Sequence, residues 1–171
     1  MGWLHEVKHD GYRVIARKDG DRVTLWSRYG TNFTDRLPRI AEAICSLAAK
    51  SALIDGEAIT LRPDGHSDFA ALRTKAGSAR ACLVAFDLLS LNGKDLRQQP
   101  IEERRGALSP LVAGVHGLIF SDAIVDQGML VFAHACAIGL EGIVSKRVGS
   151  RYSSGNSRQW LKSKNPGFER T

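Results

Sequence analysis

Apolar and polar positions alternate in the first part of the chain. The alternation covers residues 3–8, 12–18 and 22–28, and Asp10-Gly11 and Asp19-Gly20 separate these segments. A period of two is typical of strands with one buried face, and Asp-Gly is a common hairpin turn. The pattern therefore predicts an antiparallel meander of three strands.

The rest of the chain interleaves strand and helix patterns. In residues 34–50 apolar residues recur at helical spacing, which predicts a helix with Thr34 as its cap. Further helices are expected at 67–75, 100–112 and 127–138. Further strands are expected at 52–61, 82–91, 118–124, 142–146 and 160–164. The order lacks the regular alternation of a doubly wound sheet, and no linker divides it, so we expect residues 1–171 to form a single α+β domain.

The composition supports a folded core, since 43% of the residues are hydrophobic. No apolar run is long enough to span a bilayer and the first residues do not resemble a signal peptide, so we expect a soluble, cytoplasmic monomer. The three cysteines stand far apart among apolar residues and are expected to be reduced. His5 and His9 lie about 13 Å apart on a strand, too far for one metal ion to bridge.

Basic residues are concentrated at the C-terminal end of the chain. Residues 146–171 hold seven Lys or Arg and one Glu, whereas residues 1–145 hold 17 basic and 17 acidic residues. The net charge of +6 therefore belongs to this segment, which indicates a binding site for nucleotide phosphates or for a nucleic-acid backbone. A solvated tail is the alternative, but Trp160 and the alternation of Lys162 and Lys164 favour an ordered strand.

A candidate nucleophile lies close to the start of the chain, in the segment from Glu6 to Arg13. The amine of Lys8 can attack a nucleotide phosphate, the Asp-Gly turn fixes the strand that presents it, and Arg13 can bind ribose or phosphate oxygens. By itself the segment is weak evidence for a catalytic lysine, because a lysine near a terminus is usually solvated and Asp-Gly is usually only a turn. The chain contains neither a Gly-x-x-x-x-Gly-Lys-Ser/Thr loop nor a Gly-x-Gly-x-x-Gly motif, so side chains from several strands must hold any nucleotide.

Four more segments follow Lys8 and give the motif its specificity. They are Ser27-Arg28-Tyr29-Gly30, Ile54-Asp55-Gly56-Glu57, Glu141-Gly142-Ile143-Val144-Ser145-Lys146 and Trp160-Leu161-Lys162-Ser163-Lys164. In this order they resemble the motif series of covalent nucleotidyltransferases, most closely the adenylation domain of ATP-dependent DNA ligases of the bacterial end-joining type. The resemblance runs from Trp3 to Asn165. It implies an α+β fold in which two antiparallel sheets with flanking helices form a nucleotide cleft, similar to ATP-grasp proteins.

The resemblance also implies roles for individual residues. Lys8 is the catalytic nucleophile that becomes lysyl-AMP, and Lys162 and Lys164 are catalytic lysines that reach the triphosphate from one face of a strand. The implied nucleotide contacts are the backbone of Glu6 at the adenine edge, Arg13 and Arg28 at ribose and phosphate, Glu57 at a ribose hydroxyl, Phe86 stacked on adenine, and Val144 and Lys146. From the residues alone, a phenylalanine in a buried strand is more often part of the core.

A metal site is implied at two carboxylates. Glu141 is the main candidate ligand for Mg²⁺ or Mn²⁺, and Glu57 is the second, because Mg²⁺ favours one or two carboxylates together with phosphate oxygens. Read without the resemblance, Glu141 is a solvated acidic residue at a helix end.

The implied function is formation of lysyl-AMP from ATP, followed by AMP transfer to the 5′-phosphate of nicked or broken double-stranded DNA and sealing by the 3′-hydroxyl, in DNA repair or recombination. We expect the OB-fold domain that follows in family members to be absent from residues 1–171. Nick sealing would then depend on a separate OB-fold or end-joining protein. Two rivals remain open: an RNA ligase or capping-type nucleotidyltransferase, and a non-catalytic module that binds ATP or nucleic acid.

Overall fold

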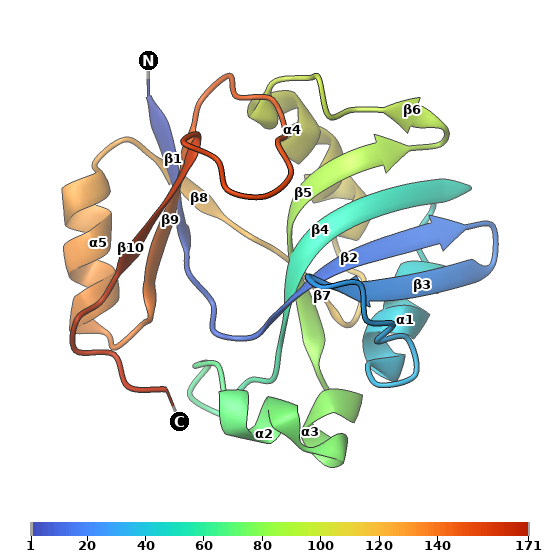
Figure 1. Ribbon diagram of the computed structural model, residues 1–171, viewed down its shortest axis with the longest axis horizontal. Helices are drawn as coiled ribbons and strands as arrows, with labels where there is room; N and C mark the ends of the chain where they lie inside the picture. The colour runs from blue at the N-terminus through green and yellow to red at the C-terminus, as the bar shows by residue number, and fades with distance from the viewer. Residues whose placement is uncertain (1, 171) are drawn as a thin grey trace.

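Two sheets lie side by side in the computed structural model, which describes residues 2–170 (Figure 1). The smaller sheet has the strand order β10-β9-β1-β8, and its pairs are antiparallel. Its strands are β1 (Trp3–Val7), β8 (Ala123–Val125), β9 (Gly142–Arg147) and β10 (Trp160–Lys164). The first strand of the chain therefore lies between strands from its last third.

The larger sheet has the order β3-β2-β4-β5-β6, and a further strand, β7, pairs with β5 in parallel. Its strands are β2 (Tyr12–Asp19), β3 (Arg22–Ser27), β4 (Ser51–Ile59), β5 (Cys82–Leu91), β6 (Lys94–Asp95) and β7 (Leu118–Phe120). The predicted α+β class with two antiparallel sheets is confirmed, with β7 as a parallel addition.

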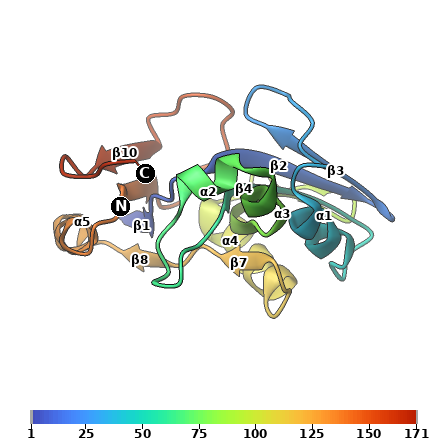
Figure 2. The ribbon, with the colours of Figure 1, turned by 90° about the horizontal axis from the view of Figure 1, so that it is seen from below.

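Helices α1, α4 and α5 cover the outer sides of the two sheets, whereas α2 and α3 connect β4 to β5 at one end of the larger sheet (Figures 1 and 2). They are α1 (Pro38–Cys45), α2 (Phe69–Arg73), α3 (Lys75–Ala79), α4 (Ile101–Val112) and α5 (Gly128–Ala137). α1 and α4 share one core with Val14 and Ala16 of β2, whereas α5 packs on β1 and β9. Because side chains alternate along a strand, Arg13 of β2 points away from that core. The face that carries Arg13 is the one that meets the smaller sheet.

The predicted three-stranded meander is wrong in its first strand. β2 and β3 form the expected hairpin, but β1 pairs with β8 and β9 in the other sheet. Asp10-Gly11 is therefore a passage between sheets and not a hairpin turn. A Cβ atom on Gly11 would lie 2.0 Å from the carbonyl oxygen of Ala58, so this passage needs a glycine where it crosses β4.

Two predicted helices differ from the observed ones. The helix expected at 34–50 is shorter, because Pro38 occupies its first turn and fixes its start; Thr34 is not its cap and accepts a hydrogen bond from the backbone N–H of Leu25. The helix expected at 67–75 ends at Arg73. Thr74 then adopts an extended conformation and caps α3 through the N–H of Gly77.

The segment expected to be one strand at 118–124 is divided into β7 and β8. Ser121 and Asp122 separate them and carry the chain from the larger sheet to the smaller one. The remaining helices and strands agree with prediction within two residues at each end, and the two-residue strand β6 was not expected.

The three cysteines are free thiols. Within residues 2–170, no helix combines the length and apolar character needed to cross a membrane.

Candidate functional site

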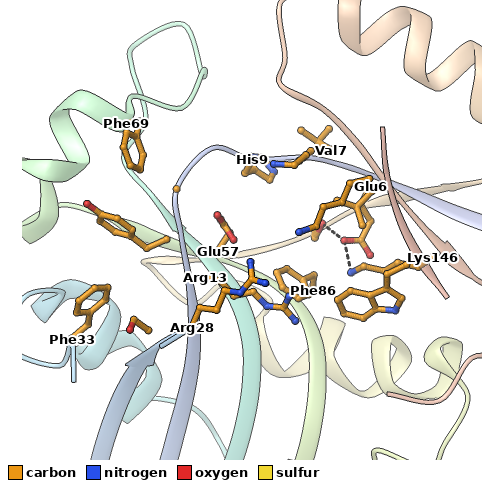
Figure 3. A pocket seen from close by; sticks show the side chains of 18 of the residues that line it. Glu6, Val7, His9, Arg13, Arg28, Phe33, Glu57, Phe69, Phe86 and Lys146 are labelled. Atoms are coloured by element: carbon orange, nitrogen blue, oxygen red, sulfur yellow. Dashed lines mark hydrogen bonds and ion pairs between the residues drawn. The ribbon is translucent and has the colours of Figure 1, made fainter. Parts of the chain in front are cut away.

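A cavity of about 550 Å³ lies between the two sheets. Strands β1, β9 and β10 supply residues on one side, and β2 to β5 supply them on the other (Figure 3). The structure brings most of the predicted site residues together around it: Glu6, Lys8, Arg13, Arg28, Glu57, Phe86, Val144, Lys146 and Lys162. The five segments noted in the sequence therefore meet in one place.

Lys8 lies just after β1, where its backbone N–H donates to the carbonyl of Gly142 at 2.9 Å. Its Nζ lies 2.5 Å from Oε1 of Glu141, and both side chains are largely buried. Glu141 does not line the first cavity. It lines a second, smaller cavity of about 300 Å³, which Lys8 also borders, so Lys8 and His9 stand between the two spaces.

One end of the first cavity is strongly positive, and we call it the cationic end. It carries Lys8, Arg13, Arg28 and Lys162. Arg13 borders the rest of the cavity as well, because its guanidinium lies 5.4 and 5.5 Å from the ring centroids of Phe86 and Trp160. Partial burial, together with the positive charges of Lys8, Arg28 and Arg13, lowers the pKa of Lys162. Four cations held in one place favour a ligand with several negative charges, such as a triphosphate.

Arg13 is held in place by a buried carboxylate beneath the cavity. Its Nε and Nη2 lie 2.9 and 2.6 Å from the two oxygens of Asp55, and the hydroxyl of Tyr152 donates to the same carboxylate at 2.7 Å. This bidentate pair fixes the plane of the guanidinium and leaves its outer edge facing the cavity.

Glu57 is a carboxyl group at the cationic end. Burial raises its pKa to about 7, although the charges of Lys8 and Arg13 act in the opposite direction. It pairs through the backbone with Arg13 on the neighbouring strand, so both side chains lie on the same face of the larger sheet. A carboxyl with a pKa near neutrality can donate or accept a hydrogen bond at the cell's pH.

The other end of the cavity is aromatic, and we call it the aromatic end. Phe86 and Trp160 meet edge to face with ring centroids 5.8 Å apart. Phe86 is half-buried and faces the cavity, so the interpretation of Phe86 as a core residue is wrong. The ammonium of Lys146 lies 4.2 Å from each ring centroid.

Glu6 lies beside Lys146 in a buried polar network. Its carboxylate accepts from Nζ of Lys146 at 2.9 Å, from Arg105 at 2.6 Å and from the hydroxyl of Ser121 at 2.9 Å. Burial lowers the pKa of Lys146, whereas the Glu6 carboxylate raises it. Sequence reasoning assigned a role only to the backbone of Glu6. The structure adds a side chain that links β1 to β9, α4 and the β7–β8 passage.

Lys164 and Glu141 are the predicted site residues that do not line the first cavity. Lys164 pairs with Gly142 at the end of β10, exposed and outside the residues that line the first cavity, although alternation places it on the same face as Lys162. The two histidines have different surroundings: Nδ1 of His5 lies 2.8 Å from Oγ of Ser145, whereas His9 lies beyond the end of β1 and borders the cavity. Burial, and then the charge of Lys8, lower the pKa of His9 to about 4.

A family of known proteins matches nearly the whole of this arrangement. The model described as "ATP dependent DNA ligase domain" matches residues 1–164. The chain belongs to this family. Lys8, the cationic end and the aromatic end all lie within the matched residues of the ligase domain.

Relatives of this ligase domain include much longer proteins. The multifunctional non-homologous end joining protein LigD of Pseudomonas aeruginosa is 38% identical over 167 residues, which are 95% of this chain and 20% of that protein. A probable DNA ligase of Streptomyces coelicolor is 36% identical over 179 residues, 93% of this chain and 34% of the relative. The ligase domain therefore spans about a fifth to a third of the length of these relatives.

Solved structures with the same architecture include a mycobacterial DNA ligase D complexed with ATP and MES. It superposes with a TM-score of 0.82 at 32% identity, over 95% of this chain and 54% of that one. The ligase domain of Mycobacterium tuberculosis LigD also gives a TM-score of 0.82, at 31% identity, over 95% of this chain and 55% of that one. The nucleotidyltransferase fold implied by the sequence motifs is thereby confirmed.

Several residues around the cavity of the ligase domain were not singled out from the sequence. Trp160 was noted as a sign of an ordered strand and as the first residue of the last motif segment, but it was given no role at the site. It lies on the same face of β10 as Lys162, which alternation alone indicates. Ser121, Arg105 and Tyr152 come from segments without a motif. Nothing in the sequence marks them, because their contacts depend on how the two sheets meet.

Proposed function

We propose that this chain is the adenylation domain of an ATP-dependent DNA ligase and forms lysyl-AMP at Lys8. The unprotonated Nζ of Lys8 attacks the α-phosphorus of ATP, so that a P–N bond forms. The bond from the α-phosphorus to the oxygen bridging the β-phosphate breaks, pyrophosphate leaves, and the nitrogen loses its proton. The observation that carries the proposal is the position of Lys8 at the edge of a cavity with one cationic and one aromatic end.

The two ends of the cavity suit the two ends of ATP. We place the triphosphate at the cationic end, against Arg13, Arg28 and Lys162, because phosphoryl transfer depends mainly on positioning and charge neutralisation. Adenine then stacks on Phe86 at the aromatic end, with Val144 beside it. Glu57, on the same sheet face as Arg13, binds a ribose hydroxyl. Lys164 adds positive charge beyond Lys162.

Glu141 and Glu57 fit a divalent metal ion such as Mg²⁺ or Mn²⁺. Oε2 of Glu141 is buried and has no hydrogen-bond partner among residues 2–170, and the half-buried Glu57 carboxyl lies close to the same charges. Two carboxylates whose oxygens are not all paired with hydrogen-bond donors can serve as part of a ligand set. Mg²⁺ completes such a set with phosphate oxygens and waters. When bound there, the metal neutralises charge on the triphosphate.

We propose that the acceptor of AMP is the 5′-phosphate of nicked or broken double-stranded DNA. The basic C-terminal segment supports contact with the phosphate backbone, but only part of its charge is available. Lys146 and Lys162 line the cavity and Arg170 is paired with Asp10, whereas exposed cations remain at Arg151, Arg158 and Lys164. Such contacts are independent of base sequence.

The names of the relatives suggest a role in joining DNA ends. We propose that the chain takes part in double-strand break repair in the bacterial cytoplasm, with an OB-fold or end-joining protein as partner, because LigD relatives are named for non-homologous end joining. We expect this domain to act as a monomer.

The proposed acceptor is tested by offering two substrates. Protein, ATP and Mg²⁺ are incubated with a nicked DNA duplex or a matching nicked RNA duplex, and AMP attached to the labelled 5′-phosphate is measured on a denaturing gel. Adenylated DNA formed in preference to adenylated RNA is the expected result. Preferential adenylation of RNA would overturn the DNA assignment and favour an RNA ligase.

A further inference from the structure

Residues 165–170, which we call the strap, leave the end of β10 and run toward α2 (Figure 1). The strap begins with a turn in which the side-chain oxygen of Asn165 accepts from the backbone N–H of Gly167 at 2.9 Å. It ends at Arg170, whose guanidinium carbon lies 4.1 Å from the ring centroid of Phe69 in α2. The strap therefore connects the smaller sheet to the helix that follows β4.

The start of the strap holds the turn that carries Glu141. The backbone N–H of Asn165 donates to the carbonyl of Glu141 at 2.8 Å, and its side-chain amide donates to the carbonyl of Leu140 at 2.9 Å. The carboxylate of Glu141 in turn lies 2.5 Å from Nζ of Lys8. The strap thus fixes the backbone of the residue that is paired with the candidate nucleophile.

The end of the strap holds the chain on the other side of Lys8. Nε of Arg170 lies 2.9 and 3.1 Å from the two carboxylate oxygens of Asp10, and Nη2 of Arg170 donates to Oδ1 as well. The Asp10 side chain is 4% exposed, whereas that of Arg170 is 56% exposed. A buried carboxylate is costly to leave without its cation, so this pair, which we call the clasp, fixes the chain two residues after Lys8.

Lys8 is therefore held from both directions along the chain. Before it, β1 pairs with β9, and the backbone N–H of Lys8 donates to the carbonyl of Gly142 at 2.9 Å. After it, β2 begins only at Tyr12, so residues 8–11 belong to no strand of their own. Within that stretch the clasp limits how far Lys8 can move.

We infer that Arg170 positions Lys8 for attack on ATP by clamping Asp10, while the start of the strap holds Glu141. The inference rests on the proposed function, in which Lys8 is the nucleophile. Arg170 is a positioning residue, because it acts on the reaction through the chain that carries Lys8. Misplacing a reacting atom by about 1 Å can slow a reaction by about 100-fold, even when the altered residue lies away from the chemistry.

The first measurement follows Lys8 without any nucleotide. The protein is treated briefly with N-hydroxysuccinimidyl acetate, which acetylates free amines, and acetylation of each lysine is measured by peptide mass. The Lys8 side chain is 16% exposed and paired with Glu141, so it should react slowly in the unaltered protein. Arg170→Gln should raise the rate of Lys8 acetylation by about 10-fold, because residues 8–11 open more often without the clasp.

Two other lysines and a matched variant control this measurement. Lys94, on the exposed strand β6, should react at the same rate in both proteins. Lys18 is 6% exposed in the larger sheet and should stay protected, which separates local release of Lys8 from a general loss of stability. Arg22→Gln makes the same change at the exposed start of β3 and should leave the acetylation of Lys8 unchanged.

The second measurement separates positioning from direct contact with the triphosphate, since Arg170 also lines the first cavity. The single-turnover rate of lysyl-AMP formation with Mg²⁺ is followed against ATP concentration. Arg170→Gln should lower the maximal rate by about 10- to 100-fold, with the half-saturating ATP concentration within about 3-fold of the unaltered value. Arg170→Lys keeps the charge but loses the fork of two donors, so its maximal rate should be intermediate. Adding Asp10→Asn to Arg170→Gln should slow the reaction no further than the slower single variant, because both changes break one contact.

The outcomes separate this inference from the proposed function. If Lys8 acetylation and the maximal rate are the same in Arg170→Gln as in Arg22→Gln, the positioning role is overturned. A large rise in the half-saturating ATP concentration at an unchanged maximal rate would also overturn it, and would assign Arg170 to the triphosphate. If Lys8 acetylation rises in Arg170→Gln but even the unaltered protein forms no lysyl-AMP, the clasp on Lys8 is supported and the proposed catalysis fails.

Discussion

Nζ of Lys8 and Oε1 of Glu141 lie 2.5 Å apart, although 133 positions separate the two residues in the chain. The contact exists because β1 pairs with β9, which begins at Gly142, so that the end of one strand meets the start of the other. The pairing of these two strands thus holds the candidate nucleophile and the candidate metal ligand together. The role of Lys8 in the reaction should therefore depend on Glu141, and the role of Glu141 should depend on Lys8.

Replacing the Glu141 carboxylate tests this dependence. We expect Glu141→Gln to slow lysyl-AMP formation by about 100-fold or more, because one preorganised charge at a reacting centre contributes on that scale. The melting temperature should change little, since the amide keeps the size of the side chain. Adenylation at the unaltered rate, with Mg²⁺ saturating, would show that Glu141 has no part in the reaction.

The raised pKa of Glu57 predicts that the stability of the protein depends on pH. Its folded-state pKa of about 7 lies above the ordinary value of 4.5, so between these pH values the native state binds more protons than the unfolded state. Stability therefore falls as the pH rises through this window. Glu57→Gln removes this contribution, and the variant should gain in free energy of unfolding relative to the unaltered protein from about pH 5 to pH 7.5. Urea titrations at several pH values measure the difference, and a constant difference would contradict the raised pKa.

Gly11 should be intolerant of any side chain. Gly11→Ala places a Cβ atom against the carbonyl oxygen of Ala58, and because backbone must move we expect a loss of more than about 2 kcal/mol in stability. Gly106→Ala is the matched control. It lies in α4 with open space around its Cβ position, and should be stabilising by about 0.5–1 kcal/mol through helix propensity. Thermal unfolding of both variants checks the contrast.

Two ion pairs of the same residue types should differ sharply in their contribution. Arg104 and Asp87 are fully buried and paired at 2.7 Å, and Arg104 also donates to the carbonyls of Gln99 and Ser150. Arg104→Met leaves a buried carboxylate without its partner and should cost about 3–5 kcal/mol. Arg97 and Asp95 form an exposed pair at the same distance, and Arg97→Met should cost less than about 1 kcal/mol. Similar losses in chemical unfolding would refute the distinction.

The sequence was sufficient to predict most strands and helices, because alternation and helical spacing are local properties of the chain. The prediction failed where the structure depends on which neighbouring strand a segment pairs with. The pattern of β1 is the same whether it pairs with β2 or with β9, and nothing within residues 3–8 distinguishes these sheets. Likewise, Ser121 and Asp122 interrupt the apolar residues of 118–124, but a polar pair does not by itself show that the chain passes from one sheet to the other there, because that passage follows from the position of both sheets.

The candidate site was predictable to the extent that motifs carry chemistry. Lys8, Arg13, Glu57 and Lys162 could be chosen because their types and order resemble a known series, and the structure gathers them around one cavity. The supporting side chains were not predictable. Arg105 reaches Glu6 from a helix 99 positions away, and such a contact is fixed only by the packing of α4 beneath the larger sheet.

The most direct test of the account is the intact mass of the protein after incubation with ATP and Mg²⁺, beside Lys8→Ala and the exposed control Lys94→Ala. We predict an increase equal to one AMP in the unaltered protein and in Lys94→Ala, reversed by pyrophosphate, and no increase in Lys8→Ala. An adduct that persists in Lys8→Ala, or no adduct in well-folded unaltered protein, would contradict covalent nucleotidyl transfer at Lys8.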